Sequence, residues 1–264
     1  MSVSVNNGPG IALVTGAARG IGKAIALRLA DDGFDVAVND TPGNADSLSK
    51  VVDEISAKGR KSSAHVADVS VEGEVKAMVE EVARAHGGLD VMVANAGVCH
   101  VGPFSDTSAD AFDRIMAVNA RGTFLCYKYA GMQMVTQGKG GRIIGACSIA
   151  GKRATSAYLG VYCASKFAVR GLTQAAALEF GPHGITVNAY APGAIETDML
   201  NFVVTNSSKY KSTENVVRDF SQQAALTRLG TPTDIANLVS FIASKESQFI
   251  TGQSLSINGG TFFD

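Results

Sequence analysis

Apolar and polar positions along the chain alternate between short hydrophobic runs and longer segments with helical character. Short apolar runs occupy 11–15, 34–40, 63–67, 89–94, 141–147, 185–190 and 254–257. Segments with helical composition or spacing occupy 23–30, 44–58, 71–86, 107–134, 157–180 and 231–244. This alternation predicts βαβ units, and hence a parallel sheet with helices on both faces. We therefore expect a single-domain α/β fold over residues 1–264, with a doubly wound, Rossmann-like sheet of about seven strands.

Local signals mark some of the helix ends. Thr231 and Pro232 fit the N-cap and first helical positions of the last predicted helix. Ser70 fits the N-cap of the helix over 71–86, whose valine and methionine side chains recur at helical spacing. Residues 193–222 are polar and show only weak helical pieces, so we interpret them as an irregular lid over the substrate.

Polar or turn-forming residues fall at the carboxyl ends of the predicted strands. In an open parallel sheet, ligands bind in the crevice outside these strand ends. The residues at or just past the ends are Thr15, Asp40, Asp68, Asn95, Ser148 and Pro192. We expect them to share one crevice.

A glycine-rich turn, Gly16-Ala-Ala-Arg-Gly-Ile-Gly22, separates the first predicted strand from the first helix. Gly16 lets the chain leave the strand sharply, while Gly20 and Gly22 let the backbone approach a pyrophosphate. The helix N-terminus adds free N–H groups and positive dipole character. In this position the turn predicts a dinucleotide site, although a purely structural turn is the alternative.

Two charged residues bear on the choice of dinucleotide. Asp40, at the end of the second strand, can accept hydrogen bonds from an adenosine ribose and would repel a 2′-phosphate, which favours NAD over NADP. Arg19 lies in the glycine turn and can pair with a 2′-phosphate, so it argues the other way. Asp68 can bond the adenine amino group, or it can be a simple neighbour of a helix cap. We give Asp40 more weight and expect NAD.

Tyr162 and Lys166 stand four residues apart in a predicted helix, which places both side chains on one face. A free tyrosine has a pKa of about 10 and exchanges protons poorly near neutral pH. An ammonium one turn away favours the phenolate and lowers that pKa. The pair is therefore a candidate acid/base centre, with an ordinary surface pair as the alternative.

Charge and hydrophobicity exclude several classes of partner. The net charge of −1 provides no basic field for nucleic acid or a membrane surface. No apolar run approaches the roughly 20 residues that span a bilayer, and the first ten residues lack the hydrophobic core of a signal peptide. We expect a cytoplasmic protein. The four cysteines, Cys99, Cys126, Cys147 and Cys163, lack the spacing of a zinc site, so we interpret them as reduced.

A series of short motifs extends along nearly the whole chain. They are Thr15-Gly-Ala-Ala-Arg-Gly-Ile-Gly22, Asp68-Val69, Asn95-Ala-Gly97, Asn119, Ser148, Tyr162-x-x-x-Lys166, Pro192-Gly193 and Thr197. In this order they resemble the motifs of the short-chain dehydrogenase/reductases. The stretch from Lys166 to Gly193 looks most like the acetoin/diacetyl reductases, also called butanediol dehydrogenases. Two departures, Ala94 in place of a frequent asparagine and Gly145-Ala-Cys147 in place of Asn-x-Ser, affect the shape of the pocket.

The resemblance implies a role for each of four catalytic residues. Tyr162 exchanges a proton with the substrate oxygen while hydride moves to or from the nicotinamide. Lys166 lowers the pKa of Tyr162 and holds the nicotinamide ribose. Ser148 bonds the carbonyl oxygen and stabilises its developing negative charge. Asn119 holds a water that links Lys166 to solvent.

The resemblance also implies the cofactor site and an oligomeric state. The implied cofactor-binding residues are Gly16, Arg19, Gly20, Ile21, Gly22, Asp40, Asp68, Val69, Asn95, Gly97, Tyr162, Lys166, Pro192, Gly193, Ile195 and Thr197. The family suggests a homotetramer, with the helix of Tyr162 and the C-terminal segment as contact faces.

The leading functional hypothesis is NAD(H)-dependent interconversion of a secondary alcohol and a ketone. The pocket is expected to be lined by Ile149, Ala150, Gly151, residues near His100 and the 193–222 lid, which suits a small acetoin-like or apolar ketone. The alternatives are an NADPH-dependent 3-oxoacyl reductase, a sugar-nucleotide epimerase and a catalytically silent dinucleotide sensor. Asp40 and the neutral charge balance argue against the reductase, the glycine spacing against the epimerase, and the intact acid/base set against the sensor.

Overall fold

The strands of the chain form one parallel sheet. The computed structural model describes residues 10–207, 209–210 and 221–263. Its strands are β1 (Ile11–Thr15), β2 (Asp35–Asp40), β3 (Ser62–Val66), β4 (Val91–Ala94), β5 (Gly141–Ala146), β6 (Ile185–Pro192) and β7 (Ser254–Ile257). They are ordered β3-β2-β1-β4-β5-β6-β7, and every neighbouring pair is parallel. The predicted doubly wound, Rossmann-like sheet is confirmed.

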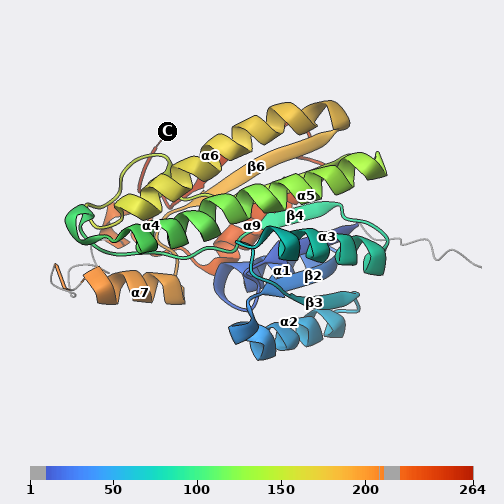
Figure 1. The fold of residues 1–264 in the computed structure, drawn as a ribbon, viewed down its shortest axis with the longest axis horizontal. Coiled ribbons are helices and arrows are strands. Elements are labelled where there is room, and N and C mark those ends of the chain that lie inside the picture. Colours follow the sequence, from blue (N-terminus) through green and yellow to red (C-terminus); the bar gives the residue numbers. More distant parts are fainter. Residues whose placement is uncertain (1–9, 208, 211–220, 264) are drawn as a thin grey trace, which may run out of the picture.

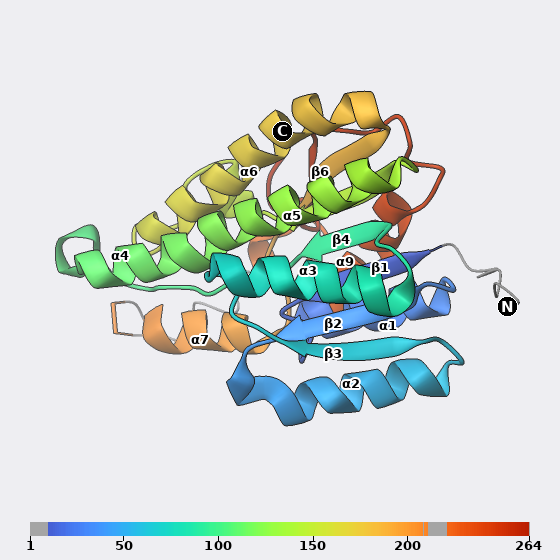
Figure 2. The same cartoon turned by 45° about the vertical axis from the view of Figure 1, so that its right-hand side comes forward.

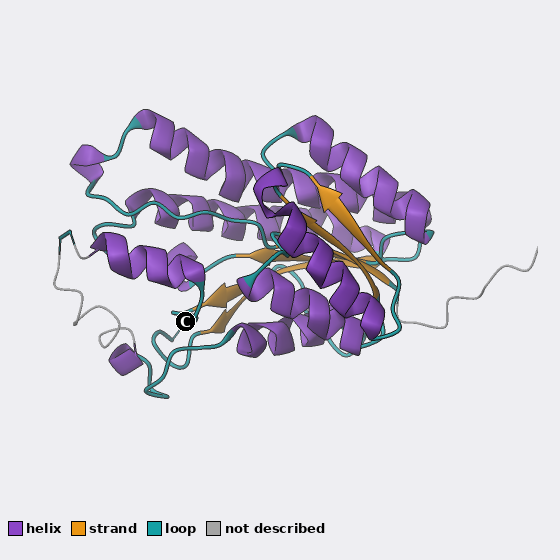
Figure 3. Cartoon of the chain, turned by 90° about the horizontal axis from the view of Figure 1, so that it is seen from below, coloured by secondary structure: helices purple, strands orange, loops and turns teal. Residues whose placement is uncertain are grey.

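Helices cover both faces of this sheet (Figures 1 and 3). One layer contains α1 (Gly20–Asp31), α2 (Ala45–Ala57) and α9 (Pro232–Ala243), and the other contains α3 (Glu72–His86), α5 (Gly122–Gln137) and α6 (Gly160–Phe180). Alternate residues of β1 enter the two apolar cores, Ala12 and Val14 on one side and Leu13 on the other. Among the described residues, no helix is both long and apolar enough to cross a bilayer.

The strand β2 is buried along its whole length, although its sequence alternates apolar and polar residues. The reason is that a parallel strand inside such a sheet is covered on both faces. Its polar side chains are paired: Asp35 contacts the Arg60 guanidinium at 2.8 Å, and the Asn39 amide donates to the carbonyl of His65 at 2.9 Å. The polar positions therefore do not mark a solvent-facing side.

The order of the strands fixes where a ligand can bind. The chain moves outward from β1 to β2 and β3, then returns to place β4 on the other side of β1. The loops after β1 and β4 therefore diverge and leave a crevice at the carboxyl ends of these strands. The helix α7 (Asp198–Ser207) lies beyond these ends (Figures 1 and 2).

Two predicted helix caps have opposite outcomes. The Thr231 side chain accepts a hydrogen bond from the Asp234 backbone, and the Asp234 carboxylate bonds back, so the predicted start of α9 is confirmed. The prediction that Ser70 caps α3 was wrong. The carboxylate of Asp68 accepts from the Ser70 backbone at 2.8 Å, and the helix begins later, with Val71 at its N-cap position.

The segment predicted as one helix over 107–134 is interrupted. It consists of α4 (Ala109–Met116), a π-helical turn (Ala117–Arg121) and α5. The π turn holds Asn119, whose side chain bonds outside the helix. Turns of this kind are frequent at functional sites, and no hydrophobic pattern predicts them.

The start of α6 and the structure of the lid segment also differ from the sequence prediction. The helix α6 begins at Gly160 rather than at residue 157, because the carbonyl of Tyr158 accepts a hydrogen bond from Gly102 in the loop after β4. The segment 193–222 was predicted to be irregular, yet it contains the regular helix α7. Residues 208 and 211–220 of this predicted lid lie outside the described part of the chain.

Candidate active site

A cleft of about 1440 Å³ lies at the carboxyl ends of the strands. Of the six predicted strand-end residues, Asp40, Asp68, Asn95, Ser148 and Pro192 line it. Thr15 instead lies buried beneath the cleft, where its hydroxyl accepts a hydrogen bond from the Asn95 backbone at 3.0 Å. All the predicted cofactor-binding residues line this cleft as well.

The glycine turn forms one wall of the cleft, and its shape fits a phosphate group. Gly16 has a φ of 63°, and a Cβ there would lie 2.9 Å from the Ala96 backbone. A Cβ at Gly22 would collide with the carbonyl oxygen of Gly16. Arg19 occupies the N-cap position of α1, but its side chain does not accept a hydrogen bond from the helix. The first backbone N–H groups of α1 are therefore not capped by this side chain. This is the arrangement that binds anions at helix N-termini.

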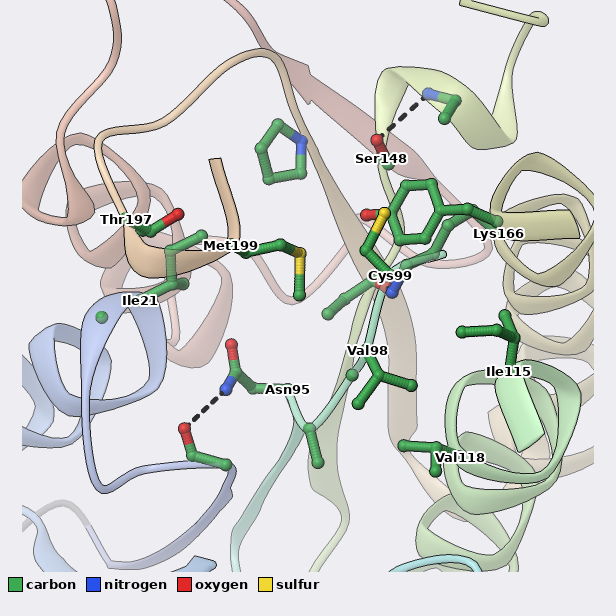
Figure 4. A pocket seen from close by; sticks show the side chains of 18 of the residues that line it. Ile21, Asn95, Val98, Cys99, Ile115, Val118, Ser148, Lys166, Thr197 and Met199 are labelled. Atoms are coloured by element: carbon green, nitrogen blue, oxygen red, sulfur yellow. Dashed lines mark hydrogen bonds between the residues drawn. The ribbon is translucent and has the colours of Figure 1, made fainter. Parts of the chain in front are cut away.

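Asn95 fixes the glycine turn against the centre of the sheet. Its amide nitrogen donates to the carbonyls of Thr15 at 2.8 Å and Gly16 at 3.1 Å, and its oxygen accepts from the Tyr190 hydroxyl at 2.7 Å. Figure 4 shows this amide directed toward the turn. Tyr190 thus links β6 to the floor of the cleft, a contact that the sequence analysis missed.

The Asp40 carboxylate lies at the same end of the cleft and is nearly buried. It accepts hydrogen bonds from the backbone of Ala18 at 3.0 Å, from the backbone of Thr41 at 2.9 Å and from the Asn44 amide at 2.8 Å. The Thr41 hydroxyl also lies 3.5 Å from Oδ1, whereas Oδ2 accepts only from Ala18, so Oδ2 retains capacity for a further hydroxyl. A negative charge is therefore held in place beside the glycine turn.

Arg19, the competing candidate at this end, is paired within the protein. Its guanidinium contacts the Asp198 carboxylate at the start of α7 at 3.1 Å, with both side chains about two-thirds exposed. Exposed pairs of this kind contribute only about 0–1 kcal/mol. The pair nevertheless partly neutralises the charge of Arg19 and joins α7 to the glycine turn.

Ser148, Tyr162 and Lys166 lie together on the opposite side of the cleft. The Ser148 oxygen accepts a hydrogen bond from the Ala150 backbone at 3.1 Å, which fixes its position at the entrance to a short 3₁₀ turn (Figure 4). The Lys166 ammonium lies 5.6 Å from the centroid of the Tyr162 ring. Three groups able to donate a hydrogen bond or a proton therefore face one space.

The prediction that the pKa of Tyr162 is lowered was wrong. Burial raises the pKa of Tyr162, the Cys99 thiol raises it further, and a hydrogen bond with Ser148 opposes both. The Lys166 ammonium instead donates to the carbonyl of Ala146 at 2.7 Å. Burial also lowers the pKa of Lys166 to about 8. Desolvation is the largest cause of both shifts, and a sequence cannot reveal its size.

Asn119 does not line the cleft, in contrast to the other three catalytic candidates. Its fully buried amide accepts from the Val98 backbone at 2.8 Å and donates to the Val98 carbonyl at 2.9 Å and the Ser165 hydroxyl at 3.0 Å. Ser165 in turn donates to the Tyr162 carbonyl at 2.7 Å. Asn119 therefore ties the loop after β4 to the helix that carries Tyr162 and Lys166.

The predicted lid segment lines the pocket through α7, whereas one residue that was expected in the lining, Gly151, does not line it. Met199 projects from α7 into the middle of the cleft, facing Cys99 (Figure 4). It belongs to a short apolar stretch of the lid segment, together with Leu200, Phe202 and Val203, which line the cleft as well. Gly151 was expected in the lining but packs below it, since a Cβ there would lie 2.5 Å from the Lys166 carbonyl oxygen.

The chain is similar to known proteins along nearly its whole length. Residues 16–261 match the family described as enoyl-(acyl carrier protein) reductase. A short-chain dehydrogenase/reductase of Armillaria gallica is 55% identical over 100% of this chain and 99% of that protein. A 3-oxoacyl-(acyl-carrier-protein) reductase of Staphylococcus epidermidis is 41% identical over 95% of this chain and 98% of its own length. The (S)-acetoin-forming diacetyl reductase of the same species is 40% identical, with 96% and 98% covered.

Two solved structures with the same fold contain a nicotinamide dinucleotide. NAD⁺-bound xylitol dehydrogenase superposes with a TM-score of 0.91 at 34% identity, covering 95% of this chain and 98% of that chain. A short-chain dehydrogenase of Burkholderia cenocepacia in complex with NADP gives 0.85 at 38% identity, with 95% and 96% covered. The chain therefore belongs to the short-chain dehydrogenase/reductase family of oxidoreductases, which bind nicotinamide dinucleotides.

Proposed function

We propose that the protein is an NAD(H)-dependent oxidoreductase that interconverts a secondary alcohol and a ketone, the latter small and acetoin-like or apolar. The observation that carries this proposal is the position of Ser148, Tyr162 and Lys166 in the same cleft as the glycine turn and Asp40. A hydride donor bound along the turn would reach the space that these three side chains face. The bound dinucleotide supplies the hydride in reduction and accepts it in oxidation.

The side chains provide the proton and stabilise the charge on the substrate oxygen. The Ser148 hydroxyl donates a hydrogen bond to the carbonyl oxygen and stabilises the negative charge that develops there. The Tyr162 hydroxyl delivers its proton to that oxygen, which gives the alcohol and leaves a phenolate. Once the phenolate has formed, the charge of the Lys166 ammonium, which lies 5.6 Å from the ring centroid, stabilises it. In oxidation the phenolate takes the proton back.

Asn119 acts on this centre through its surroundings, as a positioning residue. Its amide bonds Val98 and Ser165 and thereby holds the loop after β4 against α6. The proposed water that links Lys166 to solvent would bind at the π turn that contains Asn119.

The buried Asp40 charge supports NAD as the cofactor. A 2′-phosphate at this end would meet a carboxylate already fixed by three hydrogen-bond donors, and that juxtaposition is costly. The ion pair between Arg19 and Asp198 supports the same preference. It partly neutralises the guanidinium with which a 2′-phosphate would pair.

A second candidate is reduction of 3-oxoacyl thioesters with NADPH, because a relative bears that name. Rates with acetoin, diacetyl, 2-heptanone and acetoacetyl-pantetheine, each with NADH and with NADPH, separate the two functions. We expect ketone reduction with NADH to be the faster. Thioester reduction with NADPH as the dominant activity would favour the second candidate. Dinucleotide binding without any turnover would identify a sensor.

The rate of ketone reduction is expected to fall above about pH 8. Lys166 is protonated below its pKa of about 8 and loses its charge as the pH rises through that value. The loss removes the charge that stabilises the Tyr162 phenolate, so kcat/KM should decline about tenfold per pH unit. Initial rates between about pH 6 and about pH 10 measure this. A profile that stays flat to the alkaline end would contradict the role of Lys166.

We also propose a homotetramer that acts in the cytoplasm. The exposed side chains of Phe167 and Leu178 on α6, and of Phe263 near the C-terminus, support contact faces on the elements expected from the sequence. The mass in solution, measured by light scattering, tests this proposal.

A further inference from the structure

The cleft is larger than a single small ligand needs. Pockets for one small molecule or cofactor usually measure about 300–1,000 Å³. The volume of about 1440 Å³ therefore leaves space beside a dinucleotide for a second molecule of appreciable size. A four-carbon ketone would fill only a minor part of that space.

Apolar side chains from separate elements surround the space in front of Ser148. Cys99 comes from the loop after β4, Ile149 and Leu159 from the segment between β5 and α6, and Met199, Phe202 and Val203 from α7. Figure 4 shows Met199 and Cys99 facing each other across this space. The wall is thus apolar on the side of the sheet and on the side of the lid helix.

Two apolar side chains of α7 that line the cleft are only partly buried by the rest of the protein. Met199 is 37% exposed and Phe202 is 46% exposed, although both line the cleft. Two large apolar side chains left open to a cavity gain free energy when an apolar ligand covers them, roughly in proportion to the area removed from water. A ligand with only two methyl groups cannot provide that area.

The His100 and Arg153 side chains at this end have partners within the protein, and the Cys99 thiol between the apolar side chains is uncharged. His100 bonds the Thr107 hydroxyl at 3.3 Å, and burial keeps Cys99 a neutral thiol by raising its pKa to about 12. The Arg153 guanidinium donates to the carbonyl of Thr261 at 3.2 Å and lies 4.5 Å from the centroid of the Phe262 ring. A substrate does not have to satisfy these groups, which suits an uncharged and largely apolar molecule.

We infer that the substrate is an uncharged ketone, or the matching secondary alcohol, whose alkyl or ring substituent is much larger than those of acetoin and packs against Met199 and Phe202 of α7. This inference rests on the proposed function, because it assumes that the carbonyl oxygen binds at Ser148 and Tyr162. It chooses between the two substrate types that the proposed function leaves open.

A homologous series of 2-alkanones tests the inference. With NADH in excess, kcat/KM should rise about fourfold for each methylene added beyond 2-butanone until the space is filled. Phe202→Ala should reduce this increment for the longer ketones. Phe112→Ala is the matched control, because Phe112 is 43% exposed on α4, does not line the cleft and should leave the series unchanged. Melting temperatures and NADH binding establish that both variants are folded.

The outcomes separate the inference from the proposed function. A rate that is flat or falls with chain length, or an unchanged series in Phe202→Ala, would overturn the inference while ketone reduction itself stands. Failure to reduce any ketone with NADH or NADPH would instead overturn the proposed function. A rising series that is lost equally in both phenylalanine variants would also overturn the assignment to α7.

Discussion

Replacement of Tyr162 by phenylalanine is expected to lower kcat for ketone reduction by about 10²–10⁴-fold, the usual contribution of a positioned acid or base. The substitution removes only the hydroxyl, which is the proton source, and keeps the ring beside Lys166. The backbone of Tyr162 stays bonded to Ser165 in either form. Binding of NADH should change by no more than about fivefold, because a single hydrogen bond contributes about 1 kcal/mol.

Stopped-flow rates at saturating ketone and fluorescence titration with NADH measure the two effects separately. Tyr158→Phe is the matched control, because Tyr158 lies just before the start of α6 and stacks on Tyr210, with ring centroids 4.7 Å apart, rather than lining the cleft. It should retain the wild-type rate within about twofold. If Tyr162→Phe kept more than about a tenth of the activity, Tyr162 would not be the proton donor.

Replacement of Asp40 by asparagine is expected to shift cofactor selectivity toward NADPH by about ten- to a hundredfold. The change removes the charge but keeps an oxygen that can accept from the Ala18 backbone, so the glycine turn should retain its shape. A like charge placed against a phosphate costs several kcal/mol, and each 1.4 kcal/mol corresponds to a factor of ten.

The ratio of kcat/KM with NADH to that with NADPH measures this shift. Asp46→Asn removes an equal charge from the exposed first turn of α2 and should leave the ratio unchanged. A wild-type enzyme that already prefers NADPH would contradict the role given to Asp40. An equal change in both variants would show that net charge, rather than position, controls the ratio.

The sheet and the position of the cleft could be predicted because they follow from local patterns. Strands that alternate with helices leave only a few parallel topologies, and these place Asp40, Asn95 and Ser148 at one edge. The close approach of the first turn could also be predicted from its glycine spacing, because only glycine fits at Gly16 and Gly22.

The missed features depend on contacts between distant segments. The π turn at Asn119 arises from bonds to Val98 and Ser165, which lie 21 and 46 residues away. Tyr190 reaches Asn95 across the sheet, from a strand that lies 95 residues further along the chain. The protonation of Tyr162 and Lys166 depends on burial, which spacing along a helix does not encode.

Deuterium transfer from the dinucleotide to the substrate tests the proposed reaction most directly. The wild-type protein is incubated with 2-heptanone and NADH that carries deuterium at both C4 positions, and the product is analysed by mass spectrometry. The proposal predicts 2-heptanol with one deuterium on the carbinol carbon, and little or no product with Tyr162→Phe. Tight binding of NADH without deuterated alcohol from any ketone would contradict the proposal and leave a dinucleotide-binding protein.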